Sequence, residues 1–208
     1  MPSLRFTDKA AKSEVAAAIR AIEGATSAEV IVAVRARSGH YRHTDYLVGF
    51  VLSFAALLVF LFDTHEFSID WMPVDTLVAF VLGTLLSAGF SPLCRALTSR
   101  SLMRSNVRTA ARAAFVELGV ARTSGRSGLL VFVSTFERRV EVVPDIGIDK
   151  VVLGPPFEEA VRALDAALRR RPSFPLFLEA LRSLGPILGR ALPRGADDLN
   201  ELPDEPST

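Results

Sequence analysis

The sequence predicts an α/β fold interrupted by a membrane-spanning helical hairpin. Stretches of helical periodicity alternate with short β-branched runs in both halves of the chain, as in α/β domains. Between them lie two stretches without a charged residue, Tyr46–Phe62 and Thr76–Cys94. Crossing a bilayer takes about 20 apolar residues, with roughly 17 as the lower limit. Both stretches are therefore long enough to span a membrane.

The charges around these two stretches predict the orientation of the hairpin. Arginines precede the first stretch and follow the second, whereas the connection 63–75 holds four acidic residues and no lysine or arginine. Because basic residues accumulate on the cytoplasmic side, we expect an external connection and two cytosolic termini. Two crossings return the chain to the side it left, so residues 1–45 and 98–194 can form one discontinuous domain around the hairpin 46–97.

Small residues recur four positions apart in each apolar stretch. Gly49 precedes Ser53 by four residues, and Gly83 stands in the same relation to Ser87. Small side chains at this spacing let two membrane helices approach closely. We expect these residues to lie where the two helices meet.

The segment before the hairpin predicts one helix and one strand. Thr7 or Asp8 can cap a helix that Gly24 ends, and its apolar residues recur at helical spacing: Val15, Ile19 and Ile22. The run 28–36 is β-branched and mostly apolar. Such a run is typical of a strand buried on both faces.

The segment after the hairpin predicts helices and an antiparallel strand pair. An apolar stripe marks the first helix: Met103, Val107, Ala111, Ala114 and Leu118. Strands 129–133 and 140–143 are separated by a short charged turn, so they must be antiparallel neighbours. Pro155 and Pro156 begin another helix, and Gly185 and Pro186 interrupt a last one at 174–192. The acidic segment 195–208 has little to bury and is predicted to be disordered.

Residues 6–41 and 111–148 together resemble the TPM domain, also called the TPM phosphatase family. The closest resemblance is to bacterial members in which a transmembrane pair interrupts the domain. It covers roughly Phe6 to Arg190 and implies a three-layer α/β sandwich with a mostly parallel sheet. The three strands predicted above would belong to that sheet.

The resemblance also implies alternative activities. Some family members are described as acid phosphatases, others as maintenance factors for membrane complexes, and some bind a divalent cation through acidic loops. The acidic-asparagine-glycine element before the central strand is here Arg126-Ser127-Gly128. A cation therefore replaces a carboxylate, which would repel a metal ion. By position, the remaining acidic candidates are Asp8, Glu29 and Asp145.

Two of these carboxylates have structural alternatives. Asp145 follows a strand end, where functional loops occur, but it could equally accept backbone N–H groups and fix a turn with Gly147. Glu29 could be a ligand, or it could pair with Arg126 or with the arginines at 138 and 139. We favour the structural role for both residues.

Other polar groups give weaker indications. His40, His43 and Asp45 are close in sequence, but a metal site normally needs a fourth ligand. Arg95 and Arg100 follow the second apolar stretch and could contact anionic lipid headgroups. The single cysteine, Cys94, excludes an intramolecular disulfide. A net charge of +1 gives no reason to expect nucleic acid as a partner.

These observations predict a protein of the bacterial inner membrane with a cytosolic interaction or scaffold domain. Its expected partners are the bilayer and a membrane or membrane-associated protein, in assembly or maintenance of membrane proteins, and no cofactor is expected. The alternative is a metal-dependent acid phosphatase of low activity, which would use a divalent cation. The two hypotheses differ in whether Asp8, Glu29 and Asp145 converge in a cleft.

Overall fold

The computed structural model describes residues 6, 8–63, 68–169, 172–195, 202, 206 and 207. It divides into two compact units, which we describe separately. One combines Met1–Ser38 with Arg104–Thr208, and the other is Gly39–Met103. The sequence predicted these divisions at residues 45 and 98.

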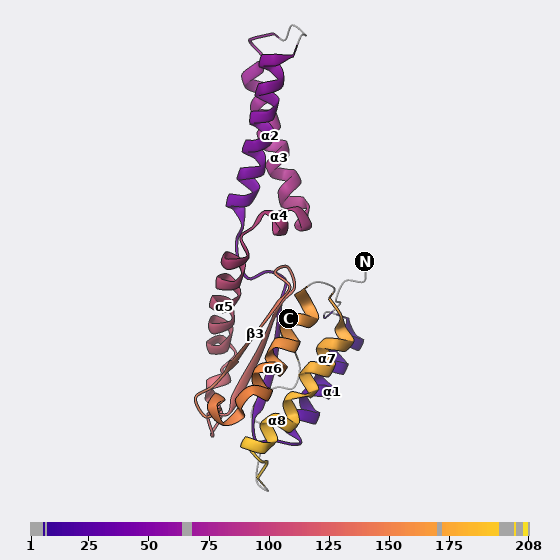
Figure 1. Cartoon of the computed structure of the whole chain (residues 1–208), viewed down its shortest axis with the longest axis vertical. Coiled ribbons are helices and arrows are strands. Elements are labelled where there is room, and N and C mark those ends of the chain that lie inside the picture. The colour runs from indigo at the N-terminus through magenta and orange to yellow at the C-terminus, as the bar shows by residue number, and fades with distance from the viewer. Residues whose placement is uncertain are drawn as a thin grey trace. The chain divides into compact units, whose positions relative to one another are not determined.

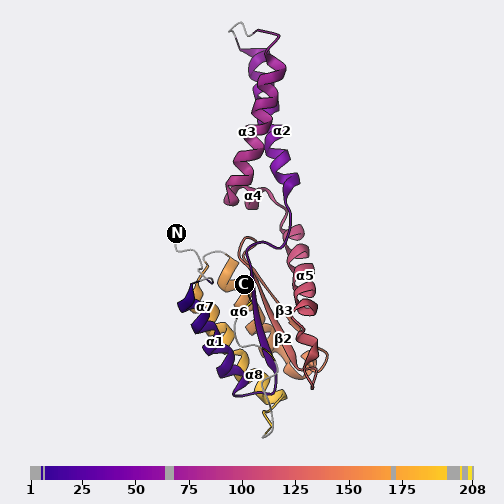
Figure 2. The same ribbon diagram turned by 180° about the vertical axis from the view of Figure 1, so that it is seen from behind.

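The first unit holds the sheet and most of the helices (Figures 1 and 2). In chain order its elements are α1 (Lys9–Glu23), β1 (Glu29–Arg35), α5 (Arg100–Glu117, which starts in the other unit), the short 3-10 helix η1 (Val120–Arg122), β2 (Gly128–Ser134), β3 (Arg139–Pro144), α6 (Lys150–Arg169), α7 (Phe174–Arg182) and α8 (Leu184–Ala191).

The described sheet has three strands in the order β1-β2-β3. β1 pairs with β2 in parallel, with Ile31 opposite Leu130. β2 pairs with β3 in antiparallel fashion, with Leu130 opposite Val143. The antiparallel pair confirms the prediction, because the short turn allows no crossover. The expectation of a mostly parallel sheet is wrong: the sheet is mixed.

Each face of the sheet packs against helices. Alternate residues along β1 point to opposite faces, as strand geometry requires. Val30, Val32 and Val34 belong to a core with α1, α6, α7 and α8. Ile31 and Ala33 belong to a second core, built with Val107, Ala111 and Ala114 of α5. β1 is thus buried on both faces, as its composition predicts.

Two helices depart from the regular geometry predicted for them. Gly154 lies inside α6 with φ of 61°, so the regular helix starts at Pro155 after one short helical turn. The sequence predicts the break between α7 and α8 at Gly185 and Pro186. The structure has it at Ser183, two residues before Gly185. The side chain of Ser183 bonds back to the Ala180 carbonyl oxygen at 2.7 Å.

The described part of segment 195–208 contacts β1. Ser207 forms an isolated parallel bridge with Ala33, and Leu202 packs against the core that contains α5. Residues 196–201, 203–205 and 208, on which most of the predicted disorder falls, lie outside the described residues, as does Thr7.

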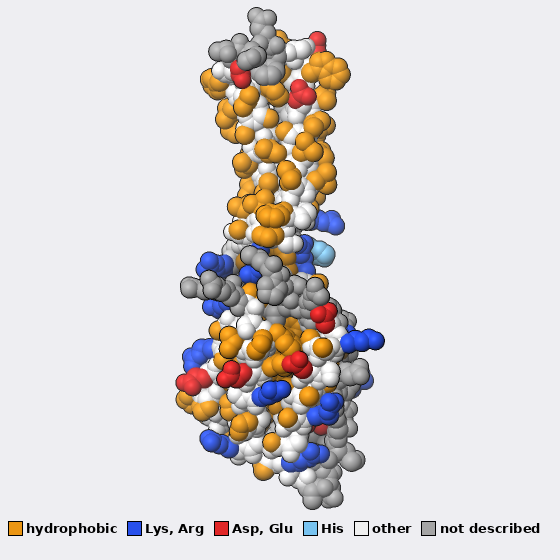
Figure 3. Space-filling view, turned by 90° about the vertical axis from the view of Figure 1, so that its right-hand side faces the viewer, with side chains coloured by type: hydrophobic (Ala, Val, Ile, Leu, Met, Phe, Trp, Pro, Cys, Tyr) orange, Lys and Arg blue, Asp and Glu red, His pale blue; other side chains and the backbone are white. Residues whose placement is uncertain are grey.

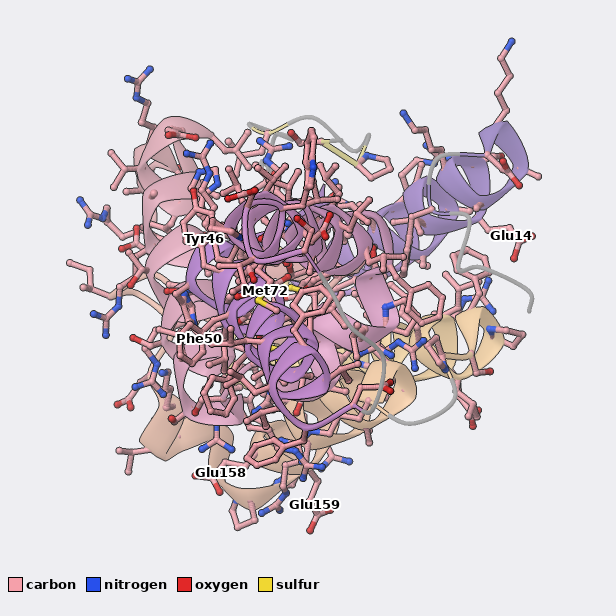
Figure 4. All side chains as sticks on the ribbon, turned by 90° about the horizontal axis from the view of Figure 1, so that it is seen from above. Glu14, Tyr46, Phe50, Met72, Glu158 and Glu159 are labelled. Carbon is pink, nitrogen blue, oxygen red and sulfur yellow. The ribbon has the colours of Figure 1, made fainter. Side chains whose placement is uncertain are left out.

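The second unit is a helical hairpin with a short third helix. Its elements are α2 (Arg42–Phe62), α3 (Met72–Gly89) and α4 (Ser91–Leu97). Apolar side chains cover the face of α2 and α3 that Figure 3 shows, and many apolar residues of both helices are exposed. Tyr46 and Phe50 lie on the outside of α2 (Figure 4), where each is more than half exposed.

The helices α2 and α3 meet at two glycines. A Cβ added to Gly83 would lie 2.9 Å from the Cα of Gly49 and 3.1 Å from the Val48 carbonyl oxygen. Nearer the open end of the hairpin, the Ser87 hydroxyl donates to Asp45 Oδ1 at 2.7 Å, and both residues are buried. Gly49, Gly83 and Ser87 therefore lie at the helix contact, as their spacing predicts, whereas Ser53, the fourth residue of the pattern, is half-buried.

We expect Gly83→Ala to weaken the hairpin. The added methyl group meets backbone atoms that cannot move without separating the helices, at a cost of about 1–3 kcal/mol. Thermal unfolding in detergent measures this loss. Gly89→Ala is the matched control, because a Cβ there meets nothing within 4 Å. Equal melting temperatures for the two variants would contradict the assigned contact.

Candidate functional site

An ion pair between Arg126 and Asp145 closes one end of the sheet. Arg126 precedes β2, and Asp145 follows β3, which runs antiparallel to it. Arg126 Nε donates to Asp145 Oδ2 at 2.8 Å, and a terminal guanidinium nitrogen donates to Oδ1 at 3.0 Å. Two parallel bonds of this kind form the strongest arrangement of arginine and carboxylate.

The backbone around this pair is equally constrained. Arg126 has φ of 50°, in the left-handed region that side chains rarely adopt. Its carbonyl oxygen accepts the Gly147 N–H at 2.9 Å, and a Cβ on Gly147 would lie 2.6 Å from that same oxygen. Position 147 therefore requires glycine for the two loops to come this close.

The carboxylate of Asp145 is fully engaged by protein groups. Besides Arg126, its Oδ1 accepts the Ile146 backbone N–H at 2.8 Å. The Asp145 side chain is 3% exposed, whereas that of Arg126 is 48% exposed. The acid is therefore covered, and the arginine lies on the surface above it. This is the geometry of a turn-fixing carboxylate.

Glu29 lies at the same end of the sheet but on the far side of β2. It is opposite Gly128 in the register, while the Asp145 N–H bonds the Gly128 carbonyl oxygen from the other side. Two strand spacings, about 10 Å, therefore separate the two positions. Val120 fills the space above Gly128, since a Cβ there would lie 2.7 Å from Val120 Cγ1. Glu29 Oε2 accepts the Leu202 N–H at 3.2 Å.

Asp8 lies far from both. It is exposed and precedes α1, whose 15 residues rise about 22 Å, whereas Glu29 follows the other end of that helix. The three carboxylates therefore do not converge. Within the residues that the structure describes, no group of three or more His, Cys, Asp or Glu side chains could hold a metal ion. That holds for the sequence cluster His40, His43 and Asp45 as well.

A polar network that the sequence analysis missed lies at the opposite end of the sheet. Ser134 ends β2 and is fully buried, and its hydroxyl donates to Glu137 Oε2. The Ser38 hydroxyl donates to Ser134 Oγ at 2.7 Å, and the Ser38 N–H donates to Glu137 Oε1 at 3.0 Å. Arg37 covers Phe136, with its guanidinium carbon 4.1 Å from the ring centre. The sequence signal that could have predicted this network is a serine at the end of each strand, Ser38 just after β1 and Ser134 at the end of β2.

This network can fix the strand ends but has no reach toward a substrate. The Ser134 hydroxyl is inaccessible, and it is the group that contacts the carboxylate. A serine nucleophile needs an exposed oxygen next to its base. Ser38, Ser134 and Glu137 therefore join the ends of β1 and β2.

Asp165 of α6 forms an ion pair and a hydrogen bond with residues of β3. Asp165 Oδ2 accepts Arg139 at 2.8 Å and Arg169 Nε at 2.7 Å, and its Oδ1 accepts the Val140 N–H at 3.2 Å. The Arg139 and Asp165 side chains are each 15% exposed. Arg139 thus pairs with Asp165, and Arg126 with Asp145.

Comparison with known proteins places the fold. No family model matches the chain, and no curated protein matches it. Among solved structures, the NMR structure of BA42 protein from the psychrophilic bacterium Bizionia argentinensis sp. nov. is similar, with a TM-score of 0.58. It is 17% identical, and the match covers 100% of this chain and 99% of that one. At this identity the likeness shows a shared α/β fold alone.

We expect Arg126 and Asp145 to be coupled in stability. Asp145→Ala leaves the guanidinium and the Ile146 N–H without their acceptor, and Arg126→Ala leaves a buried carboxylate without its cation. Each change should cost about 1–3 kcal/mol, at the low end because Arg126 is half exposed. A double-mutant cycle by chemical unfolding measures the coupling. Arg112→Ala, an exposed arginine of α5, is the control. Additive effects of the two changes would contradict a stabilising pair.

Proposed function

We propose that this chain is an integral membrane protein whose hairpin holds a TPM-like interaction domain at the cytosolic face of a bacterial inner membrane. The observation that carries the proposal is the surface of α2 and α3. Both are long enough to cross a membrane, with mean hydropathy of 2.2 and 1.6, and only 11% of each apolar window is buried. The core helix of a soluble domain would be mostly buried.

The exposed side chains make water an unsuitable solvent for this hairpin. Many leucine, valine and phenylalanine side chains on α2 and α3 are exposed, and Phe50, Val59 and Leu85 are each more than half exposed. Burial of such a side chain in an apolar medium gains about 1.5–3 kcal/mol. A lipid bilayer supplies that medium along the whole hairpin. Arg95 and Arg100 would then contact anionic headgroups, at about 1 kcal/mol each.

An interaction role fits the first unit better than hydrolysis does. Asp145 is covered and doubly bonded by Arg126, and Glu29 is two strands away. Metal-assisted phosphate hydrolysis needs hard oxygens converging on one ion. The same proposal includes membership of the TPM family and a three-layer arrangement of the domain. It also includes a role in assembly or maintenance of membrane proteins. The helices on both faces of the sheet support that arrangement.

Cysteine labelling tests the proposed topology. In a Cys94→Ser background, we expect Asp70→Cys to react with a membrane-impermeant maleimide in intact spheroplasts. Glu14→Cys and Glu159→Cys should react only after lysis, because they lie on the cytosolic domain; all three positions are exposed. Equal labelling of the three before lysis, or release of the chain by carbonate washing, would refute the hairpin.

Phosphatase assays test the alternative. With a model phosphate ester and Mg²⁺ or Mn²⁺, we expect the purified chain to release no phosphate above buffer, because no described group gathers the ligands that a metal requires. Phosphate release that Asp145→Ala abolishes and Asp149→Ala preserves would establish hydrolysis instead.

A further inference from the structure

The backbone groups on the outer edge of β1 form hydrogen bonds with the Glu23 side chain and with the backbone of Ser207. Because β2 pairs with one side of β1, alternate residues direct their backbone groups to the other side. The Val30 N–H donates to Glu23 Oε1 at 3.0 Å. The Val32 carbonyl oxygen accepts the Ser207 N–H at 3.0 Å, and the Val34 N–H donates to the Ser207 oxygen at 2.7 Å. Ser207 thus binds β1 as a residue of a parallel strand would.

The same edge receives two more groups from this end of the chain. The Leu202 N–H donates to Glu29 Oε2, and the Leu202 side chain packs against the core that contains Ile31 and Ala33. Pro206 is buried. Position 202 therefore meets the start of β1 and position 207 meets Ala33, so the contacts follow the direction of the strand.

Charge distinguishes this segment from the rest of the chain. Residues 195–208 include five acidic residues and no basic one. The remaining residues carry a net charge of +6, since the whole chain carries +1 and this segment carries −5. The segment that reaches the edge is therefore acidic, although the carboxylates of Glu23 and Glu29 already bond backbone groups there.

We propose that the outer edge of β1 is a docking site for an acidic peptide segment of a partner protein, added in parallel to the sheet. Leu202 and Ser207 of this chain contact the site in cis and act as a competitor. Main-chain bonds to Val32 and Val34 supply affinity, and a leucine five positions earlier supplies selectivity through the apolar face of β1. The proposal rests on the interaction role given above and names the chemistry of the partner.

Tethering explains why the site is filled in the free chain. A segment on the same chain acts at an effective concentration that reaches the millimolar range for short flexible links. The described part of the segment is held by two backbone hydrogen bonds of Ser207, by the bond of the Leu202 N–H to Glu29 and by the packing of the Leu202 side chain. A partner peptide must therefore bind the edge of β1 more tightly than the tethered segment does, or the contacts of that segment with β1 must first be weakened.

A peptide-binding experiment on the full chain in detergent tests the proposal. The probe is a fluorescein-labelled peptide of residues 196–208, followed by anisotropy. The Ser207→Pro chain lacks the N–H that binds Val32, so its edge should be free; the Ser207→Ala chain keeps that N–H. We expect the probe to bind the Ser207→Pro chain at least tenfold more tightly than wild type, and the Ser207→Ala chain within about twofold of wild type.

The specificity controls use the peptide itself. A probe that carries Ser207→Pro should lose at least tenfold in affinity, and a scrambled peptide of the same charge should bind no better. Equal binding of the scrambled probe would overturn the site in favour of charge alone. A chain truncated after Gly195 provides a second free edge, with circular dichroism to show that it is folded. If the probe binds neither this folded chain nor Ser207→Pro, the proposal is wrong.

Two further outcomes distinguish the docking site from a dimer of this chain and from the proposed membrane topology. A Ser207-dependent dimer of the wild-type chain in size-exclusion chromatography with light scattering would show that a second copy, and not a partner, takes the edge. The cysteine labelling above does not depend on β1. Failure of peptide binding with correct labelling would therefore overturn the docking site and leave the membrane topology standing.

Discussion

The parallel pairing of β1 with β2 is the constraint on which the rest of the structure depends. The register sets Glu29 against Gly128 and Arg35 against Ser134, and the entire hairpin lies between the two strands in sequence. Parallel strands need a crossover, and here the crossover contains α2 to α5. The cost of closing a long connection grows only slowly with length. The packing of α2 against α3 folds most of that connection back on itself, which makes the pairing accessible.

The same pairing decides what the candidate site can do. Because Glu29 and Asp145 lie on opposite sides of Gly128 and each carboxylate bonds its own protein groups, the two do not converge on one ion. Arg126, in its left-handed backbone conformation, supplies to Asp145 the positive charge that a cation would otherwise supply. Arg126 thereby joins the loop before β2 to the loop after β3 by an ion pair.

Periodicity in the sequence predicted the elements better than their arrangement. Val15, Ile19 and Ile22 are buried on α1 as expected, and the three strands fall within one residue of their predicted ends. The mixed sheet was missed because the family resemblance, not the residue pattern, supplied the expectation of mostly parallel strands. The distance between Glu29 and Asp145 depends on strand register, which no local pattern contains. Ser38 and Glu137 are 99 residues apart in sequence, so their contact could not be predicted either.

The Ser38–Ser134–Glu137 network lies where β1 leads into the second unit. Any mechanical tension that the hairpin transmits along this strand must pass through Ser38 before it loads the backbone ladder between β1 and β2. The two hydrogen bonds of Ser38 then bear the force first. The buried Glu137, which accepts bonds from both Ser38 and Ser134, would then resist separation of β1 from β2.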